Sequence, residues 1–439
     1  MDEPTPETIR PRDREAILQS LRSGVVPRRG QRFIQVGRKL EIEALLRDIE
    51  TVGDGGSALR FVIGEFGSGK TFFLFLVRAI AMERGLVCAH ADLNPDRRLH
   101  GTSGEARSLY SELMANLATR SRPEGGAAPS VVERFVSSAL SAAKAHGESV
   151  DSVLSERLGS LAELVGGYDF AEVIAAYWRG HNTGDDRLKT DAIRWLRGEF
   201  TTKTDARRAL GVRTIVDDDN FYDQLKLFAR FVRLAEYGGL LVCLDEMVNL
   251  YKLANTRARA SNYEQILRIL NDSFQGASVG LGFLMGGTPE FLMDERRGLY
   301  SYEALRSRLG ANQFAVGGFK DLSGPVLLLQ NLTQEEIYVL LLKLRGIFGA
   351  GGPLGSRMPD EALVAFLDHC YRKVGEAYFR TPRNTIRGFL ELLAVLDQNP
   401  QASWQDLLPG VTLENERDPD LNVAGIGGLA DNEIASFEI

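Results

Sequence analysis

Apolar residues follow two rhythms along this chain. Short apolar runs at residues 61–63, 86–92, 240–244 and 280–285 end at glycine or polar residues, and they predict strands buried on both faces. Elsewhere apolar residues recur every three or four positions, which predicts amphipathic helices. Because single strands alternate with helices, we expect an α/β fold with a parallel sheet flanked by helices.

The helical rhythm divides the chain into unequal parts. A long helical block lies between the second and third predicted strands of one sheet, so we interpret it as an insertion. After residue 331 the pattern is helical only. We therefore expect an N-terminal arm at 1–35, an α/β domain at 36–330 with a helical insertion at about 95–236, a C-terminal helical lid at 331–399 and a tail at 400–439.

Composition is that of a soluble globular protein, with 44% hydrophobic and 25% charged residues in a chain of 439. The net charge of −7 argues against a generally basic surface but leaves room for a local basic stripe. Cys88, Cys243 and Cys370 are scattered, which indicates buried thiols in a reducing compartment. Without a run of about 20 apolar residues we expect no membrane span. These features favour the cytoplasm.

A phosphate-binding loop follows the first predicted strand. Its residues are Gly64-Glu65-Phe66-Gly67-Ser68-Gly69-Lys70-Thr71, and an apolar helical segment comes next. Strand, glycine-rich loop and helix in this order let backbone N–H groups surround an anion at the helix N-terminus. Lys70 would reach the β- and γ-phosphates, and the Thr71 hydroxyl would ligate Mg²⁺. The alternative, a glycine-rich turn that happens to carry a lysine, does not explain the flanking elements. We therefore predict binding of ATP with Mg²⁺.

A carboxylate pair ends the third predicted strand. Asp245 and Glu246 follow the five apolar residues 240–244, so their side chains would lie at the carboxyl edge of the sheet. Asp245 would hold Mg²⁺ through water, and Glu246 would act as general base on the attacking water.

Four further positions have two interpretations each. Gly37 and Arg38 form either a turn that closes over the adenine or an ordinary helix N-terminus. Thr288 senses the γ-phosphate or caps the following helix. Arg308 is a finger that reaches a neighbouring subunit's nucleotide, or a surface charge or intrachain ion pair. Arg383 swings toward the γ-phosphate from the lid, or it belongs to a helix-initiating Pro-Arg pair.

Three adjacent acids, Asp217, Asp218 and Asp219, offer a metal site or a helix N-cap, and their place before a predicted helix favours the cap.

The order of these motifs resembles that of the AAA+ ATPases, in the branch of the origin-recognition initiators. The resemblance covers roughly residues 36–93 and 236–398, and it places Thr288 at the first sensor, Arg308 near the arginine finger and Arg383 at the second sensor. It implies a P-loop NTPase that hydrolyses ATP between subunits of a homo-oligomer.

Several phrases are also similar to the small ATP-binding proteins of bacteriophage-exclusion (BREX) defence systems. They are residues 195–199, the Asp-Asp-Asn of 218–220, residues 287–290 and Thr381-Pro382-Arg383. This resemblance implies a role in phage defence, acting on double-stranded DNA or loading a helicase partner. Only about 40 residues follow the lid, too few for the winged helix of the initiators, so DNA contacts must lie elsewhere. We expect them at Arg257 and Arg259, in the loop after the acidic strand.

Two other functions fit the same motifs. One is a scaffold whose assembly is gated by nucleotide while hydrolysis is slow. The other is a signalling NTPase of the STAND type, which shares the Val-Gly-Arg-x-x-Glu opening at residues 36–41 but normally carries a long repeat region that this chain lacks.

Overall fold

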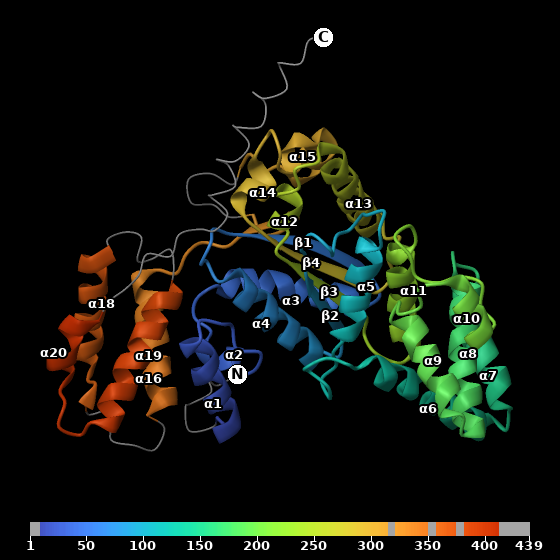
Figure 1. Cartoon of the computed structure of the whole chain (residues 1–439), viewed down its shortest axis with the longest axis horizontal. Coiled ribbons are helices and arrows are strands. Elements are labelled where there is room, and N and C mark those ends of the chain that lie inside the picture. Colours follow the sequence, from blue (N-terminus) through green and yellow to red (C-terminus); the bar gives the residue numbers. More distant parts are fainter. Residues whose placement is uncertain (1–8, 315–320, 350–356, 375–381, 412–439) are drawn as a thin grey trace, which may run out of the picture. The chain divides into compact units, whose positions relative to one another are not determined.

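The computed structural model describes residues 9–314, 321–349, 357–374 and 382–411. The chain divides into two compact units, which are described separately (Figure 1). One unit holds residues 39–63 and 73–328, with every strand of the described chain. The other holds the chain up to residue 38, residues 64–72 and the chain from 329 onward.

The described residues form one parallel sheet of five strands in the order β2-β3-β4-β1-β5. The strands are β1 (Ser57–Ile63), β2 (Val87–Asp92), β3 (Leu240–Asp245), β4 (Leu281–Gly287) and β5 (Val326–Leu328). All residues of β3 and β4 are buried, as central parallel strands require. The predicted α/β class and the first four strands are confirmed.

Helices cover both faces of this sheet. Gly282 of β4 faces Val52 of α3 (Lys39–Gly53), and Gly286 faces Leu74 of α4 (Lys70–Glu83). On the opposite face, the ring of Phe283 lies 6.2 Å from that of Tyr222 in α11 (Phe221–Leu234). Because side chains alternate along a strand, α3 and α4 share one face of β4 and α11 packs on the other.

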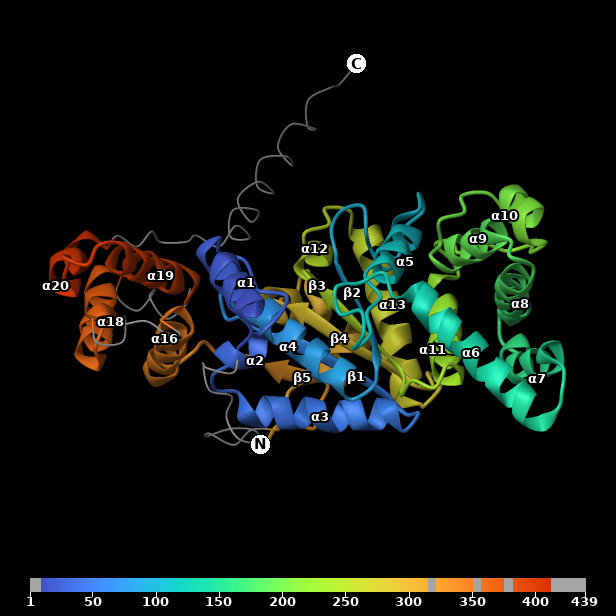
Figure 2. The same cartoon turned by 90° about the horizontal axis from the view of Figure 1, so that it is seen from below.

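The chain between β2 and β3 is helical, although these strands are direct neighbours that pair from Val87↔Leu240 to Asp92↔Asp245. Helices α6 to α10 form a group to one side of the sheet (green in Figure 1; see also Figure 2). The bounds of the helices before α11 are α5 Glu105–Ala115, α6 Ala128–His146, α7 Val150–Ala162, α8 Gly167–Thr183, α9 Asp186–Leu196 and α10 Lys203–Leu210. Phe170 of α8 contacts Trp195 of α9 and Phe231 of α11 edge-on, so this group shares an aromatic core with α11.

One long helix and several short elements connect the later strands. After β3 come α12 (Val248–Tyr251) and α13 (Thr256–Phe274), and after β4 come α14 (Pro289–Met293), the 3₁₀ turn η2 (Leu299–Ser301) and α15 (Glu303–Leu309).

The described part of the second unit consists of helices joined by loops, and it includes the glycine-rich loop at residues 64–69. Its helices are α1 (Pro11–Arg22), α2 (Gln31–Ile34), α16 (Gln334–Phe348), α18 (Asp360–Val374), α19 (Pro382–Gln398) and α20 (Trp404–Leu407), followed by the 3₁₀ turn η4 (Leu408–Gly410). Ile17 of α1, Ile34 of α2, Leu341 of α16 and Phe389 of α19 belong to one apolar core. The N-terminal helices therefore share a core with the helices predicted to form the lid.

Two sequence predictions about this unit can be compared with it. Thr333 and Glu336 form a reciprocal capping box at the start of α16, as their spacing predicts. The expected tail begins at residue 400, and its part from 412 to 439 lies outside the described residues.

All three cysteines are free and buried, as predicted. Burial raises the pKa of the Cys243 and Cys370 thiols to about 12. No helix among the described residues combines the length and apolarity that a membrane crossing requires.

Candidate functional site

The loop after β1 has the backbone of an anion cradle. Gly67 and Gly69 have φ angles of 80° and 82°, in the left-handed region that side chains disfavour. A Cβ on Gly64 would lie 2.4 Å from Ser68 Oγ and 3.0 Å from the Leu329 carbonyl oxygen. Gly67 and Gly69 by their backbone angles, and Gly64 by its close neighbours, could not be replaced by residues with side chains without rearrangement.

The polar groups of this loop suit a phosphate. Lys70 Nζ donates to the carbonyl oxygens of Gly64 (2.8 Å) and Glu65 (3.0 Å), so the ammonium lies across the loop. Ser68 Oγ is buried and has no hydrogen-bond partner among the described residues. Buried polar groups are normally paired, so this hydroxyl and the ammonium form a site with binding capacity for an anion. These residues fit the triphosphate of a nucleotide.

Arg38 contacts the same loop from the preceding chain. Its guanidinium donates to the Ser68 carbonyl oxygen and, at 3.4 Å, to that of Gln330. Gly37 and Arg38 both have positive φ angles, 64° and 57°, and a Cβ on Gly37 would lie 1.8 Å from Glu336 Oε1. The pair therefore forms a tight left-handed turn that braces the loop. An ordinary helix N-terminus would not require this backbone conformation. Contact of this turn with adenine stays a prediction.

Arg383 also lies beside the loop. It is the second residue of α19, and its guanidinium carbon lies 6.0 Å from the centre of the Phe66 ring, within the range of a cation–π contact. An expected lid arginine is thus brought to the glycine-rich loop. Sensing of the γ-phosphate by Arg383 stays a prediction, and Thr381 of the same motif lies outside the described residues.

The acidic end of β3 has an unusual backbone. Asp245 is buried, and its Oδ1 accepts a hydrogen bond of 2.9 Å from the backbone N–H of Glu246. Glu246 is exposed and has a φ of 56°. A left-handed glutamate immediately after a buried strand costs about 1–3 kcal/mol, and residues with such strain cluster at active sites.

The strand ends are level with one another. Ile63, the last residue of β1, pairs with Gly287 of β4, and Leu244 of β3 pairs with Met285. Asp245 therefore stands level with Gly286, and the glycine-rich loop leaves β1 at the next residue after Ile63. Carboxyl ends of parallel strands are where α/β proteins bind ligands.

The sequence matches, over residues 9–411, the model of a family described as BREX system ATP-binding protein BrxC/D. The chain belongs to this family. No curated protein matches the sequence. Family membership confirms the resemblance to BREX ATP-binding proteins, and it agrees with a loop suited to a triphosphate.

Thr288 of this BREX-family protein is the N-cap of α14. Its hydroxyl accepts from the backbone N–H of Phe291 at 3.4 Å, so the capping interpretation is confirmed. Its role as a sensor stays a prediction. Arg308 is exposed and donates to Asn271 Oδ1 (2.9 Å) and the Ala304 carbonyl oxygen (2.8 Å), so the structure holds it on its own chain. Action on a neighbouring subunit also stays a prediction.

The predicted loop position of Arg257 and Arg259 is wrong. Both lie in the first turn of α13, which begins at Thr256 because the Asn255 side chain caps it by accepting from the backbone N–H of Ala258. Arg259 is buried and donates to the Leu253 carbonyl oxygen at 2.6 Å, so its guanidinium serves the chain's own backbone. Arg257 is exposed, and its contact with DNA stays a prediction.

Asp218 has a role that sequence reasoning missed. Its carboxylate accepts backbone N–H groups of Gly104, Ala106 and Arg107, so it caps α5 across 114 positions of sequence. The predicted cap of the helix that follows these acids is wrong: α11 begins after Asn220 without a capping side-chain hydrogen bond, and Asp218 caps α5 instead. Among the described residues no group of three or more His, Cys, Asp or Glu side chains gathers to hold a metal ion. No local sequence pattern could have predicted that Asp218 caps α5, because the two are more than 100 residues apart in the sequence.

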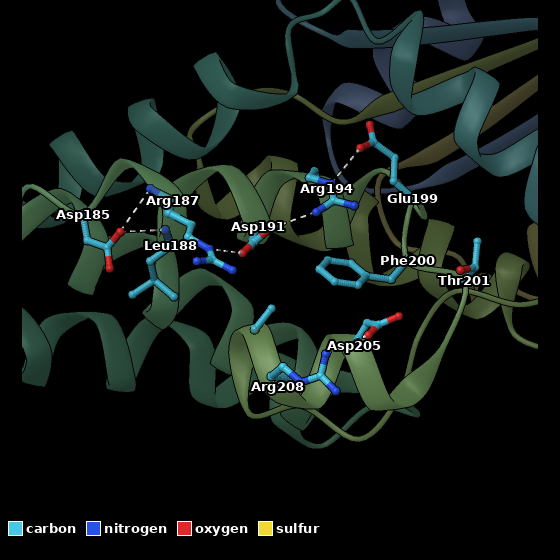
Figure 3. Close-up of a pocket in the computed structure, with 11 residues that line it drawn as sticks. Asp185, Arg187, Leu188, Asp191, Arg194, Glu199, Phe200, Thr201, Asp205 and Arg208 are labelled. Carbon is cyan, nitrogen blue, oxygen red and sulfur yellow. Dashed lines mark hydrogen bonds and ion pairs between the residues drawn. The ribbon is translucent and has the colours of Figure 1, made fainter.

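A groove, separate from the glycine-rich loop, lies in the helical insertion between α9 and α10 (Figure 3). Its volume is about 640 Å³, and its walls carry charges of both signs. Arg194 pairs with Asp191 at 3.0 Å and with Glu199 at 3.5 Å, and Arg208 pairs with Asp205 at 3.4 Å. Because these arginines have acidic partners, the groove lacks the cationic excess of a triphosphate site.

Proposed function

We propose that this protein is an AAA+ ATPase that binds ATP with Mg²⁺ and hydrolyses it to ADP and phosphate. The observation that carries the proposal is the level alignment of strand ends, which brings Asp245 to the sheet edge where the glycine-rich loop departs. Residues 36–330 would be the nucleotide-binding domain and 331–399 the lid.

The roles of the residues follow from their chemistry. The loop N–H groups and Lys70 bind the phosphates, while Thr71 and Asp245 would hold Mg²⁺, which neutralises phosphate charge when bound. Glu246, exposed and set apart from Asp245 by its left-handed backbone, takes the proton of the attacking water. Thr288, Arg383 and a neighbour's Arg308 would stabilise charge that develops on the γ-phosphate.

Replacement of Glu246 by Gln tests the general base. ATP binding should persist because Gln keeps the size of the side chain, while the turnover rate should fall by about 10²–10⁴-fold. Glu264→Gln, on α13, is the matched control and should hydrolyse ATP at the parental rate. A parental rate in Glu246→Gln would refute the assignment.

The partner is the second part of the proposal. We infer that hydrolysis drives loading or remodelling of a DNA-bound partner, such as a helicase, by a homo-oligomer of this chain in the cytoplasm. The BREX family assignment and the fit of the loop to a triphosphate support it. Mass measurement with and without ATP and duplex DNA tests assembly. Duplex DNA should raise the ATPase rate, whereas unchanged hydrolysis alongside nucleotide-dependent assembly would favour a scaffold.

A further inference from the structure

The segment from residue 10 to residue 39 carries a net positive charge, opposite in sign to the net charge of the whole protein. It holds nine Arg and Lys residues and two acids, in a protein whose net charge is −7. The remaining residues therefore carry a net charge of −14. A local basic segment in an acidic protein indicates a surface for an anionic partner.

Most of these cations lie on the surface of the folded unit. We define the basic surface as the exposed side chains of Arg10, Arg12, Arg22, Arg28 and Arg32. Within the described residues no carboxylate forms an ion pair with any of the five, in contrast to the paired arginines of the insertion groove. Arg22 lies over the Phe348 ring at 5.2 Å, a contact that orients its guanidinium and leaves its charge uncompensated.

The turn that carries two of the cations is fixed against α1. Gly30 has a φ of 75°, and a Cβ there would lie 2.5 Å from Ile17 Cδ1, which is fully buried in the core. The Gln31 side chain donates to the Pro27 carbonyl oxygen at 2.7 Å and closes the turn. Arg28, which is exposed, therefore stands on a turn fixed against α1, so binding need not order this turn first.

We propose that the basic surface binds the phosphate backbone of double-helical nucleic acid. Eight of the nine cations are arginine, whose planar guanidinium can make two parallel hydrogen bonds to one phosphate. The proposal deepens the proposed action on DNA and rests on it for its biological role, but it is independent of ATP hydrolysis.

Two other anionic partners fit less well. Single strands are usually held by stacking on exposed aromatic rings, and Phe33, the one aromatic residue of this segment, is 9% exposed. A membrane-surface helix needs a free apolar face, but α1 buries Ile17 and Leu18 in the core shared with α16 and α19. The surface thus offers charge without stacking or insertion.

Fluorescence anisotropy of the full chain with a labelled DNA duplex tests the proposal. The variant Arg12→Gln/Arg28→Gln/Arg32→Gln should bind at least about tenfold more weakly at moderate salt, and the slope of log K against log salt should become shallower by about 2–3. The matched control is Arg120→Gln/Arg187→Gln/Arg208→Gln, which removes the same charge from exposed positions outside the basic surface and should bind as the parent does.

Parallel titrations with duplex RNA, single-stranded DNA and anionic vesicles separate the possible sources of phosphate. Stronger binding of either duplex than of the other two probes supports the proposal, and the comparison of DNA with RNA identifies the natural source. Equal losses in both triple variants, no loss in the first, or a preference for vesicles would overturn it. ATP hydrolysis without nucleic acid should be parental in both variants, so failure here is distinguishable from failure of the ATPase assignment.

Discussion

Gly286 is a position where one added methyl group should impair hydrolysis more than folding. A Cβ there would lie 2.5 Å from Asp245 Oδ1 and 2.9 Å from Leu74 Cδ1, whereas ordinary contact begins at 3.4 Å. In Gly286→Ala the carboxylate oxygen must therefore withdraw by about 0.9 Å. A displacement of about 1 Å at a catalytic centre can cost on the order of 100-fold in rate.

Gly282→Ala is the matched control. This glycine lies four positions earlier on the same face of β4, and its added Cβ would lie 2.9 Å from Val52 Cγ2 and 3.1 Å from Leu241 Cδ1. Both variants overpack the same face of β4, so each should lose about 1–3 kcal/mol of unfolding free energy. Only Gly286→Ala disturbs a carboxylate.

Steady-state ATP hydrolysis and thermal unfolding, measured on both variants, separate the two effects. We expect similar melting temperatures, a rate near the parental value for Gly282→Ala, and a loss on the order of 100-fold for Gly286→Ala. If folded Gly286→Ala hydrolyses ATP as fast as Gly282→Ala, then the position of the Asp245 carboxylate is not critical and the proposed Mg²⁺ ligand is wrong.

Two further substitutions test contacts made across the sequence. Arg38→Gln removes a charged donor to the Ser68 carbonyl oxygen, worth about 1.5–3 kcal/mol, so calorimetric titration should show ATP affinity reduced by about 10- to 100-fold. Lys39→Gln, at an exposed neighbour, should leave affinity unchanged, and equal affinities in the two variants would contradict the bracing role. Asp218→Asn removes the charge that caps α5 and should cost about 1–2 kcal/mol in urea unfolding. The exposed Asp219→Asn is its control, and coincident unfolding curves for the pair would exclude the cap.

Local patterns predicted most of the sheet, because buried parallel strands are read directly as apolar runs. The exception is β5, residues 326–328, which sequence analysis did not identify. Three residues are too few to show a period, and Leu328 is 54% exposed, so the strand exists only through its pairing with β1. Propensity cannot reveal a strand that depends on a partner.

The candidate site residues also differ in whether local sequence could predict them. The glycine-rich loop and the acidic strand end are local motifs, so their positions could be read from spacing alone. The contact of Arg38 with Ser68 joins residues 30 positions apart, and the Asp218 cap joins residues more than 100 apart. Arg257 and Arg259 lie on a helix and not in a loop because Asn255 caps α13, which begins one residue later.

Backbone strain separates functional from structural positions in this fold. Arg38, Glu236 and Glu246 are the non-glycine residues with positive φ in the described chain. Glu236 has a local cause: it follows the C-terminal end of α11, where the N–H groups of Glu236 and Tyr237 bond to the carbonyls of Arg233 and Val232. Such a left-handed helix end is common and needs no function.

Arg38 and Glu246 follow no helix end. Arg38 precedes α3 and reaches the glycine-rich loop, while Glu246 follows the buried strand β3 and is exposed. Each conformation costs about 1–3 kcal/mol that glycine would avoid. A charged side chain stands at each strained position, where glycine would be unstrained, which argues that the side chains themselves have a role. Arg38 and Glu246 are therefore better supported as parts of the nucleotide site than Thr288, whose hydroxyl already has a structural role as a helix cap.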